Sequence, residues 1–166
     1  AHNSFDHAVM RSLKKNQPFM LMECAPGLVN WHEYNKLKRP GVHKLFSAQA
    51  VACGSDTVQY FQWRKSRGSF EQYHGAVVDH LGTDDTRVFK EVAEVGVMLD
   101  SLSNVKGTIV KPKAALIFDW DNMWAIDNMR GLSDKTKNYA KTCIQIYHEF
   151  LKLGIDMNVV ADRKSV

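Results

Sequence analysis

The sequence has 166 residues, of which 45% are hydrophobic and 24% charged, a balance typical of a globular protein with one domain or two incomplete ones. The net charge of +4 is too small, and the basic residues too scattered, to indicate a nucleic-acid partner. No apolar run approaches the roughly 20 residues that a membrane-spanning helix needs. We therefore expect neither nucleic acid nor a membrane as a partner.

The cysteines indicate a reducing compartment. Cys24, Cys53 and Cys143 are far apart and form no CxxC pair or His/Cys cluster. An odd number of widely spaced cysteines argues against a disulfide framework and against a zinc site. The sequence therefore predicts a cytoplasmic protein without a bound metal.

The first elements in chain order are a helix and a short strand. Residues 4–15 are expected to form the helix, with Ser4 or Asp6 as its N-cap. Residues 19–22 are four consecutive apolar residues between Pro18 and Glu23, which is typical of a buried parallel strand. Glu23 follows this strand directly.

A similar alternation continues to about residue 102. The pattern predicts a helix at 40–52, a strand at 57–63 and a longer helix at 84–102, for which Asp84 or Asp85 is the expected cap. The loop 64–74 between them is rich in polar and aromatic residues.

A composition change near residues 105–113 separates the remaining elements. We expect a strand at 114–118, a helix at 139–153 and a strand at 157–160. The acidic and aromatic segment 119–127 is expected to be a packing or interface loop. Because it lacks the Ser, Thr and Gly of a phosphate-binding loop, no flavin is expected.

Strands that alternate with helices predict an α/β fold with parallel sheets. In such folds the functional residues gather at the carboxyl ends of the strands. The polar and aromatic residues after the first two predicted strands occupy this position.

A sugar-binding pocket is a plausible interpretation of these residues. Carboxylates bind sugar hydroxyls and flat aromatic rings stack on sugar C–H faces. The residues themselves leave other roles open: Glu23 could be a helix cap or an ion-pair partner, Trp31 a loop anchor, His74 a structural histidine and Arg64 a surface charge.

Several ordered motifs resemble the β-galactosidases of glycoside hydrolase family 42. They are PFMLME at 18–23, NW at 30–31, KRPG at 38–41, YFQWR at 60–64, FEQYHGAV at 70–77 and RVFKEV at 87–92. A family-like start of a second domain follows at residue 114.

The resemblance implies a fold and a domain division. Residues 1–106 are expected to be the C-terminal part of a catalytic (β/α)8 TIM barrel, with strand seven at 19–23 and strand eight at 57–63. Residues 107–166 are expected to be the first, truncated part of a flavodoxin-like trimerisation domain.

The resemblance also implies an activity and its residues. The parent enzyme is expected to be a retaining glycosidase that releases terminal β-D-galactose from a galactoside or galacto-oligosaccharide substrate. Glu23 matches the catalytic nucleophile. Trp31, Glu71 and His74 match substrate-binding residues, and Tyr60 and Arg64 are given only supporting roles.

The resemblance places the partner acid/base, a glutamate, outside this stretch of sequence. We therefore expect an internal piece of a homotrimeric enzyme that needs no cofactor or metal here and is inactive alone. Two alternatives stay open: a non-catalytic trimerisation or interaction module, and a related retaining glycosidase for another sugar, such as an arabinosidase or fucosidase.

Overall fold

The computed structural model describes residues 2–131 and 137–162. Contacts between them divide the chain into two units. Residues 18–108 form the central unit. Residues up to 17, together with those from 109 onward, form the terminal unit. The chain thus leaves the terminal unit after its first helix and returns to it near residue 109.

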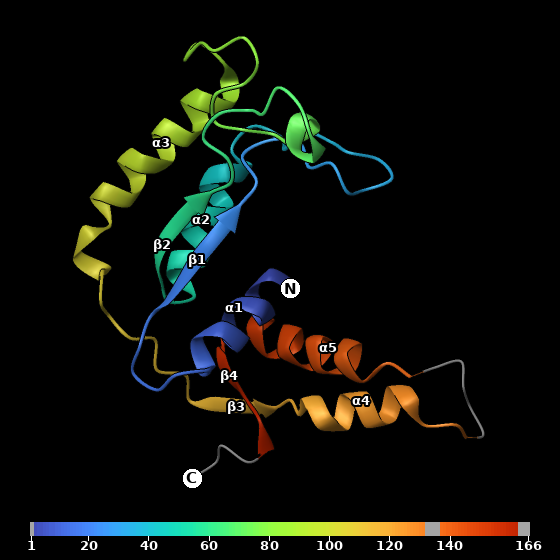
Figure 1. Ribbon diagram of the computed structural model, residues 1–166. Helices are drawn as coiled ribbons and strands as arrows, with labels where there is room; N and C mark the ends of the chain where they lie inside the picture. The colour runs from blue at the N-terminus through green and yellow to red at the C-terminus, as the bar shows by residue number, and fades with distance from the viewer. Residues whose placement is uncertain (1, 132–136, 163–166) are drawn as a thin grey trace. The chain divides into compact units, whose positions relative to one another are not determined.

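The central unit is built on two parallel strands joined by a helix. Strand β1 (Phe19–Cys24) pairs with β2 (Ser55–Tyr60), and α2 (Val42–Ala52) connects them. Both arrowheads point toward the same set of loops (Figure 1). Parallel pairing through a crossover helix is a βαβ unit, as the alternating pattern predicted.

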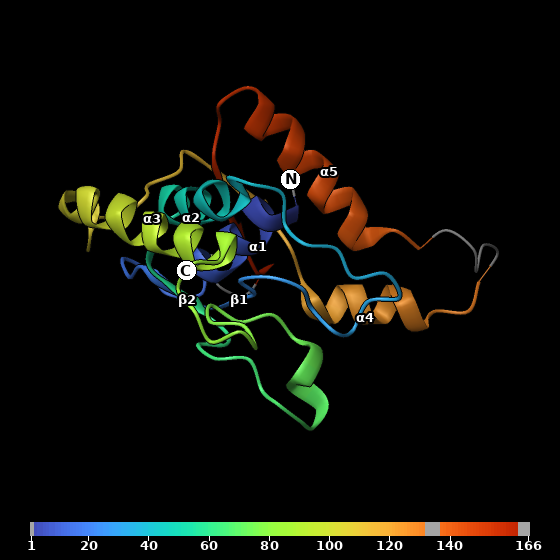
Figure 2. The ribbon, with the colours of Figure 1, turned by 90° about the horizontal axis from the view of Figure 1, so that it is seen from above.

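The long helix α3 (Arg87–Ser101) lies beside α2 in both views (Figures 1 and 2). Its N-cap is Thr86, whose hydroxyl accepts a hydrogen bond from the backbone N–H of Phe89 at 3.2 Å. The expected cap at Asp84 or Asp85 was therefore wrong. A threonine hydroxyl can cap a helix as an aspartate carboxylate does, by accepting a hydrogen bond from the N–H three residues later. The helix begins only at Arg87, so Thr86 rather than an aspartate stands at the capping position.

Two short 3-10 helices complete the central unit. One, η1 (Phe70–Tyr73), lies in the loop that follows β2, and the other, η2 (Ser103–Val105), follows α3. Strand β2 ends at Tyr60, earlier than the predicted residue 63. The backbone from residue 61 instead begins the loop that carries η1.

In its described residues, the terminal unit has its own parallel strand pair and three helices. Strands β3 and β4 pair in register from Ala114–Met157 to Ile117–Val160. The elements in chain order are α1 (His2–Ser12), β3 (Ala114–Ile117), α4 (Trp120–Asn128), α5 (Tyr139–Lys152) and β4 (Met157–Val160).

The core of the terminal unit draws on both ends of the chain. Phe5 of α1 is buried, and its ring lies 5.6 Å from each of the rings of Phe118 and Tyr147, edge to face. Arg11 forms an ion pair with Asp156 at 2.9 Å. Helix α1 therefore packs with the segment that begins at residue 109, while the domain bounds 1–106 and 107–166 stay a prediction.

The segment 119–127, expected to be a loop, is mostly helix α4. The Asp119 carboxylate accepts hydrogen bonds from the backbone N–H groups of Asp121, at 2.9 Å, and Asn122, at 3.4 Å. This side chain satisfies two of the free N–H donors at the start of the helix. The helix could not be recognised in the sequence because the acidic segment has no clear apolar periodicity. None of the helices within the described residues is long and apolar enough to cross a membrane.

Candidate active site

Glu23 lies at the carboxyl end of β1, as its next-to-last residue, with an exposed side chain. The adjacent strands stay joined just beyond it, because the backbone N–H of Phe61 donates to the carbonyl of Cys24 at 3.2 Å. Glu23 therefore stands where the loops after β1 and β2 begin. Glu23 lies one residue inside the strand rather than after it, so the sheet holds the backbone that carries its carboxylate.

Two loops approach each other beyond these strand ends. We call residues 25–41 the first loop and residues 61–86 the second loop. The amide of Gly75 donates to the carbonyl of Leu28 at 2.6 Å, and the Asn30 side-chain amide donates to the carbonyl of Phe70, also at 2.6 Å. The second loop, with η1, projects well away from the strands (Figure 2).

An aromatic layer spans the two loops. Trp31 of the first loop stacks on the ring of His74 in the second, with centroids 5.2 Å apart and planes 27° apart. Phe61 meets the same imidazole edge-on at 5.1 Å. His74 has no exposed surface, whereas 61% of Trp31 is exposed. His74 thus supports Trp31 from behind, and the outer side of the indole is open to a flat ligand.

The hydrogen bond made by His74 decides which of its ring nitrogens carries the proton. Nδ1 lies 2.8 Å from the carbonyl oxygen of Gly75, which can only accept, so Nδ1 is the donor. Nε2 of a neutral imidazole is then an acceptor, and it is buried without a hydrogen-bond partner among the residues that the structure describes. The contact between His74 and a sugar hydroxyl that the resemblance implies stays a prediction.

Glu71 is half-buried within η1 and is connected to the first loop. Its Oε2 accepts from the Asn30 side chain at 3.5 Å, and its backbone carbonyl accepts from the Gln62 side chain at 3.5 Å. These contacts join Glu71, Trp31 and His74 into one group of loop residues. Its proposed role in binding hydroxyl groups also stays a prediction.

Tyr60 and Arg64 lie outside this group. The Tyr60 hydroxyl lies 3.3 Å from that of Ser47 on α2, and its ring meets His43 edge-on at 5.8 Å. Burial raises the pKa of the Tyr60 phenol. Arg64 is exposed, and its backbone forms a bridge with Val78. Tyr60 therefore packs the strand pair against α2, in keeping with a supporting role.

Comparison with known proteins assigns the family. A sequence model for the β-galactosidases of glycoside hydrolase family 42 matches residues 1–102, and a model for the β-galactosidase trimerisation domain matches residues 112–166. The chain belongs to glycoside hydrolase family 42. Its fold is accordingly α/β, the C-terminal part of a TIM barrel followed by part of the trimerisation domain, which confirms the fold class expected from the sequence.

Relatives in this family cover almost the whole chain. It is 51% identical over 156 residues to the β-galactosidase Pbg of Clostridium perfringens and 48% identical over 163 residues to the β-galactosidase BglY of Alicyclobacillus acidocaldarius. These alignments cover 94% and 98% of this chain but only 23% and 24% of the relatives. The chain thus spans about a quarter of their length.

Solved structures of the family agree. A catalytic mutant of Gan42B, a family 42 β-galactosidase from G. stearothermophilus, is 49% identical with a TM-score of 0.94, covering 98% of this chain and 24% of that one. The β-galactosidase of the haloarchaeon Halorubrum lacusprofundi is 28% identical with a TM-score of 0.79, over 95% and 23%. The elements of this family 42 chain are thus kept at much lower identity.

Sequence reasoning gave no role to two residues that support the site. Phe61 belongs to the YFQWR motif at 60–64, and its position at the end of a strand could have indicated a place in the site. Lys38 donates to the carbonyl of Ala25 and to Cys24 Sγ at 3.6 Å, while its own carbonyl accepts from Arg87 at 3.0 Å. Lys38 therefore fixes the backbone immediately after Glu23.

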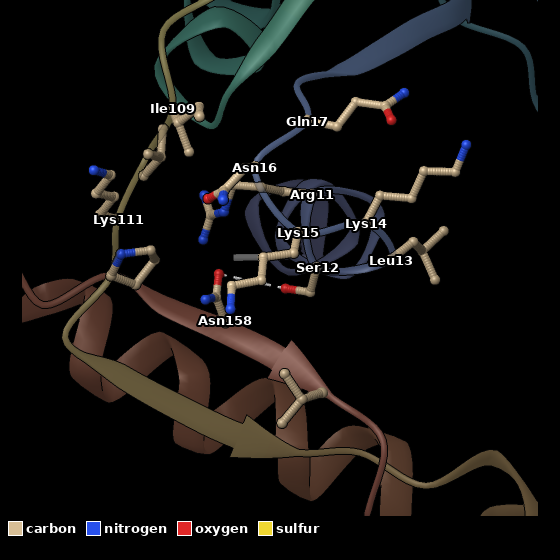
Figure 3. A pocket seen from close by; sticks show the side chains of 13 residues that line it. Arg11, Ser12, Leu13, Lys14, Lys15, Asn16, Gln17, Ile109, Lys111 and Asn158 are labelled. Carbon is tan, nitrogen blue, oxygen red and sulfur yellow. Dashed lines mark hydrogen bonds between the residues drawn. The ribbon is translucent and has the colours of Figure 1, made fainter. Parts of the chain in front are cut away.

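A separate hollow of about 700 Å³ lies in the terminal unit (Figure 3). Among the described residues that line it, every acidic or basic side chain is cationic: Arg11, Lys14, Lys15 and Lys111. Hydrolysis of a glycoside requires a pair of carboxyl groups. The hollow therefore does not compete with the strand-end site for this chemistry.

Proposed function

We propose that the full-length protein is a retaining β-galactosidase whose nucleophile is Glu23. The observation that carries the proposal is the exposed carboxylate at the carboxyl end of β1, beside a loop group with an open tryptophan face. Relatives about 50% identical to this family 42 chain bear the name β-galactosidase. The substrate class is a terminal β-D-galactoside or galacto-oligosaccharide.

The chemistry follows from the retaining mechanism of such enzymes. The Glu23 carboxylate attacks the anomeric carbon as the glycosidic bond breaks, and a covalent galactosyl-enzyme forms. A second carboxyl group, about 5–5.5 Å from the first, gives a proton to the leaving oxygen and then activates the water that releases galactose. We propose that this group comes from a part of the full-length enzyme outside these 166 residues.

The loop residues take binding roles in this proposal. Trp31 offers its exposed face to the C–H side of galactose. Glu71 accepts hydrogen bonds from sugar hydroxyls, and Nε2 of His74 accepts a hydrogen bond from another hydroxyl. Because Nε2 of His74 is buried here, this last contact requires a local rearrangement of the loops when sugar binds. No metal or cofactor enters the scheme.

The decisive experiment replaces the nucleophile in the full-length enzyme. Glu23→Gln keeps the shape of the side chain but replaces the nucleophilic carboxylate with a neutral amide, so turnover of nitrophenyl β-galactoside should fall by at least about 1000-fold. A fluorinated galactoside should label the wild-type enzyme, and peptide mass spectrometry should place the label on Glu23.

A matched control is Glu33→Gln, which changes an exposed carboxylate in the first loop and should leave turnover near the wild-type value. A panel of nitrophenyl glycosides, including arabinosides and fucosides, tests the sugar. Wild-type activity in Glu23→Gln, or a label on another residue, would refute the assignment.

We further propose that the full-length enzyme is a cytoplasmic homotrimer and that this stretch alone does not hydrolyse galactosides. The trimerisation-domain match supports assembly, and the free thiols of Cys24, Cys53 and Cys143 support a reducing compartment. Light scattering should give three times the mass of one subunit for the full-length enzyme. Galactoside turnover by the purified 166-residue chain, with host enzyme excluded, would contradict the second part, and a stable trimer of that chain would favour an interaction module.

A further inference from the structure

Gly75 lies where the second loop touches the first. Its N–H donates to the carbonyl of Leu28 at 2.6 Å. A Cβ at this position would lie 2.7 Å from the backbone nitrogen of Leu28 and 2.8 Å from both its carbonyl oxygen and the Cα of Gly27. All three are backbone atoms, so no flexible side chain could move aside. We call this contact between Gly75 and residues 27–28 the loop clasp.

Steric contact, rather than backbone conformation, is what requires glycine at this point. The φ angle of Gly75 lies outside the left-handed region. Other residue types could therefore adopt its backbone conformation if space allowed. Any side chain would instead push the two loops apart or rotate the peptide that joins residues 75 and 76.

That peptide also controls the aromatic layer. The carbonyl of Gly75 holds Nδ1 of His74 at 2.8 Å, and the imidazole in turn supports Trp31 at 5.2 Å and contacts Phe61 at 5.1 Å. The atoms of one glycine thus set both the spacing of the loops and the orientation of the histidine. A displacement of Gly75 reaches Trp31 through a single intervening ring.

We propose that Gly75 is a positioning residue of the sugar site: the loop clasp holds His74 so that Trp31 presents its open face to the substrate. The proposal rests on the function proposed above, since it assumes that Trp31 meets the sugar. Gly75 itself touches no reacting atom. Its effect on hydrolysis passes through His74 and Trp31.

The test is Gly75→Ala in the full-length enzyme, assayed with nitrophenyl β-galactoside. A shift of about 1 Å in a substrate-positioning group can lower the rate as much as 100-fold, so kcat/KM should fall about 10- to 100-fold, chiefly through a higher KM. The fluorinated galactoside should still label Glu23. A value of kcat/KM within twofold of wild type would overturn the proposal.

Two glycines provide matched controls. Gly68 lies in the same second loop, and a Cβ there would meet nothing within 4 Å, so Gly68→Ala should keep wild-type kinetics. A Cβ on Gly27 would meet only the Cα of Gly75, at an ordinary 3.5 Å, so Gly27→Ala should cost less than Gly75→Ala. Equal losses in all three variants would show a general sensitivity of the loops and would also overturn the proposal.

A double-mutant cycle separates positioning from general destabilisation. In a Trp31→Ala background the indole is gone, so Gly75→Ala should lower kcat/KM by a clearly smaller factor than it does in the wild type, since only the part that acts through His74 remains. If Gly75→Ala merely destabilised the protein, it would lower kcat/KM by the same factor in the Trp31→Ala background as in the wild type. Such additivity would refute the positioning role, whatever the single variant shows.

A milder variant covers the case in which Gly75→Ala does not fold. Asn30→Ala removes the second link between the loops, the 2.6 Å hydrogen bond to the Phe70 carbonyl, without adding any atoms. It should lower kcat/KM in the same direction and again show coupling to Trp31→Ala. Wild-type kinetics, or losses that simply multiply, would overturn the proposal.

The Glu23→Gln variant keeps the two proposals distinguishable. If Glu23→Gln retains full turnover, the proposed function has failed, and the positioning role of Gly75 that rests on it fails as well. If it is inactive while Gly75→Ala behaves like Gly68→Ala, only the positioning role of Gly75 has failed.

Discussion

At the scale of single residues, the central unit holds a buried histidine beneath the site. His43 on α2 has 1% of its surface exposed, and its Nε2 lies 3.8 Å from Glu91 Oε2. Burial lowers the pKa of His43 below 6.5, and the nearby Lys38 cation lowers it further. Glu91 opposes both effects, but Arg87 competes for this carboxylate at 2.8 Å.

This lowered pKa predicts a loss of stability in acid. Near pH 7 the imidazole is neutral in both states. As the pH falls through 6.5, the unfolded chain binds a proton before the folded one does, so the free energy of unfolding decreases. His43→Gln should therefore show a smaller drop in thermal midpoint between pH 7.5 and pH 5.5 than the wild type. The exposed His80 supplies the control, since His80→Gln should keep the full drop.

The residues of the candidate site show why a sequence only partly predicts a site. The position of Glu23 after an apolar run could be inferred, because strand ends in α/β folds follow from local pattern. The stack of Trp31 on His74 joins residues 43 positions apart, and no periodicity predicts such a contact. Gly75 is equally inconspicuous in the sequence, since its requirement comes from the backbone of Leu28 in another loop.

At the scale of elements, the long amphipathic segments were predicted well. Helices α2 and α5 and strand β4 begin and end within two residues of their expected bounds, because apolar spacing sets their buried faces. Helix α4 was missed because its start depends on a side-chain cap, Asp119, rather than on apolar periodicity.

Strand ends were predicted less well for a related reason. Apolar residues after Tyr60, including Phe61 and Trp63, suggested a longer strand. The backbone there leaves β2 and pairs with the returning end of the second loop instead, through N–H groups of Val77 and Val78 that donate to Gln62 and Trp63 at 2.9 and 2.8 Å. Phe61 still donates to Cys24 at the end of β1, but Gln62 and Trp63 pair with the second loop, so the predicted strand 57–63 was too long at this end.

At the scale of the whole molecule, the chain passes from one unit to the other and back. Helix α1 was predicted from its own periodicity, but Ser4 and Asp6 lie inside it rather than at its cap, because it runs from His2 to Ser12. Its partner could not be predicted, because the residues it packs against lie more than 100 positions further on. Arg11 donates to the carbonyl of Met157 at 2.9 Å, and the backbone N–H of Val159 donates to the Ser12 hydroxyl at 2.9 Å. Family 42 sequence assigned to the barrel thus contributes a helix to the core of the terminal unit.

This arrangement predicts that damage to α1 is felt in one unit only. Phe5→Ala removes a buried ring from between Phe118 and Tyr147, which should destabilise the terminal unit by about 3–5 kcal/mol. Hydrogen exchange followed by mass spectrometry on the full-length enzyme should then show amides of β3 and β4 exchanging roughly 100- to 5000-fold faster, with β1 and β2 unchanged.

Met10→Ala is the control on the same helix, because 49% of Met10 is exposed in this structure and its loss should leave exchange in β3 and β4 nearly unaltered. Equal acceleration in all four strands would mean that the two units unfold together, and α1 would then stabilise the whole molecule rather than the terminal unit. Unchanged exchange in β3 and β4 would remove α1 from the core altogether. Selective acceleration would show that the trimerisation segment depends on a helix placed before β1 in the sequence.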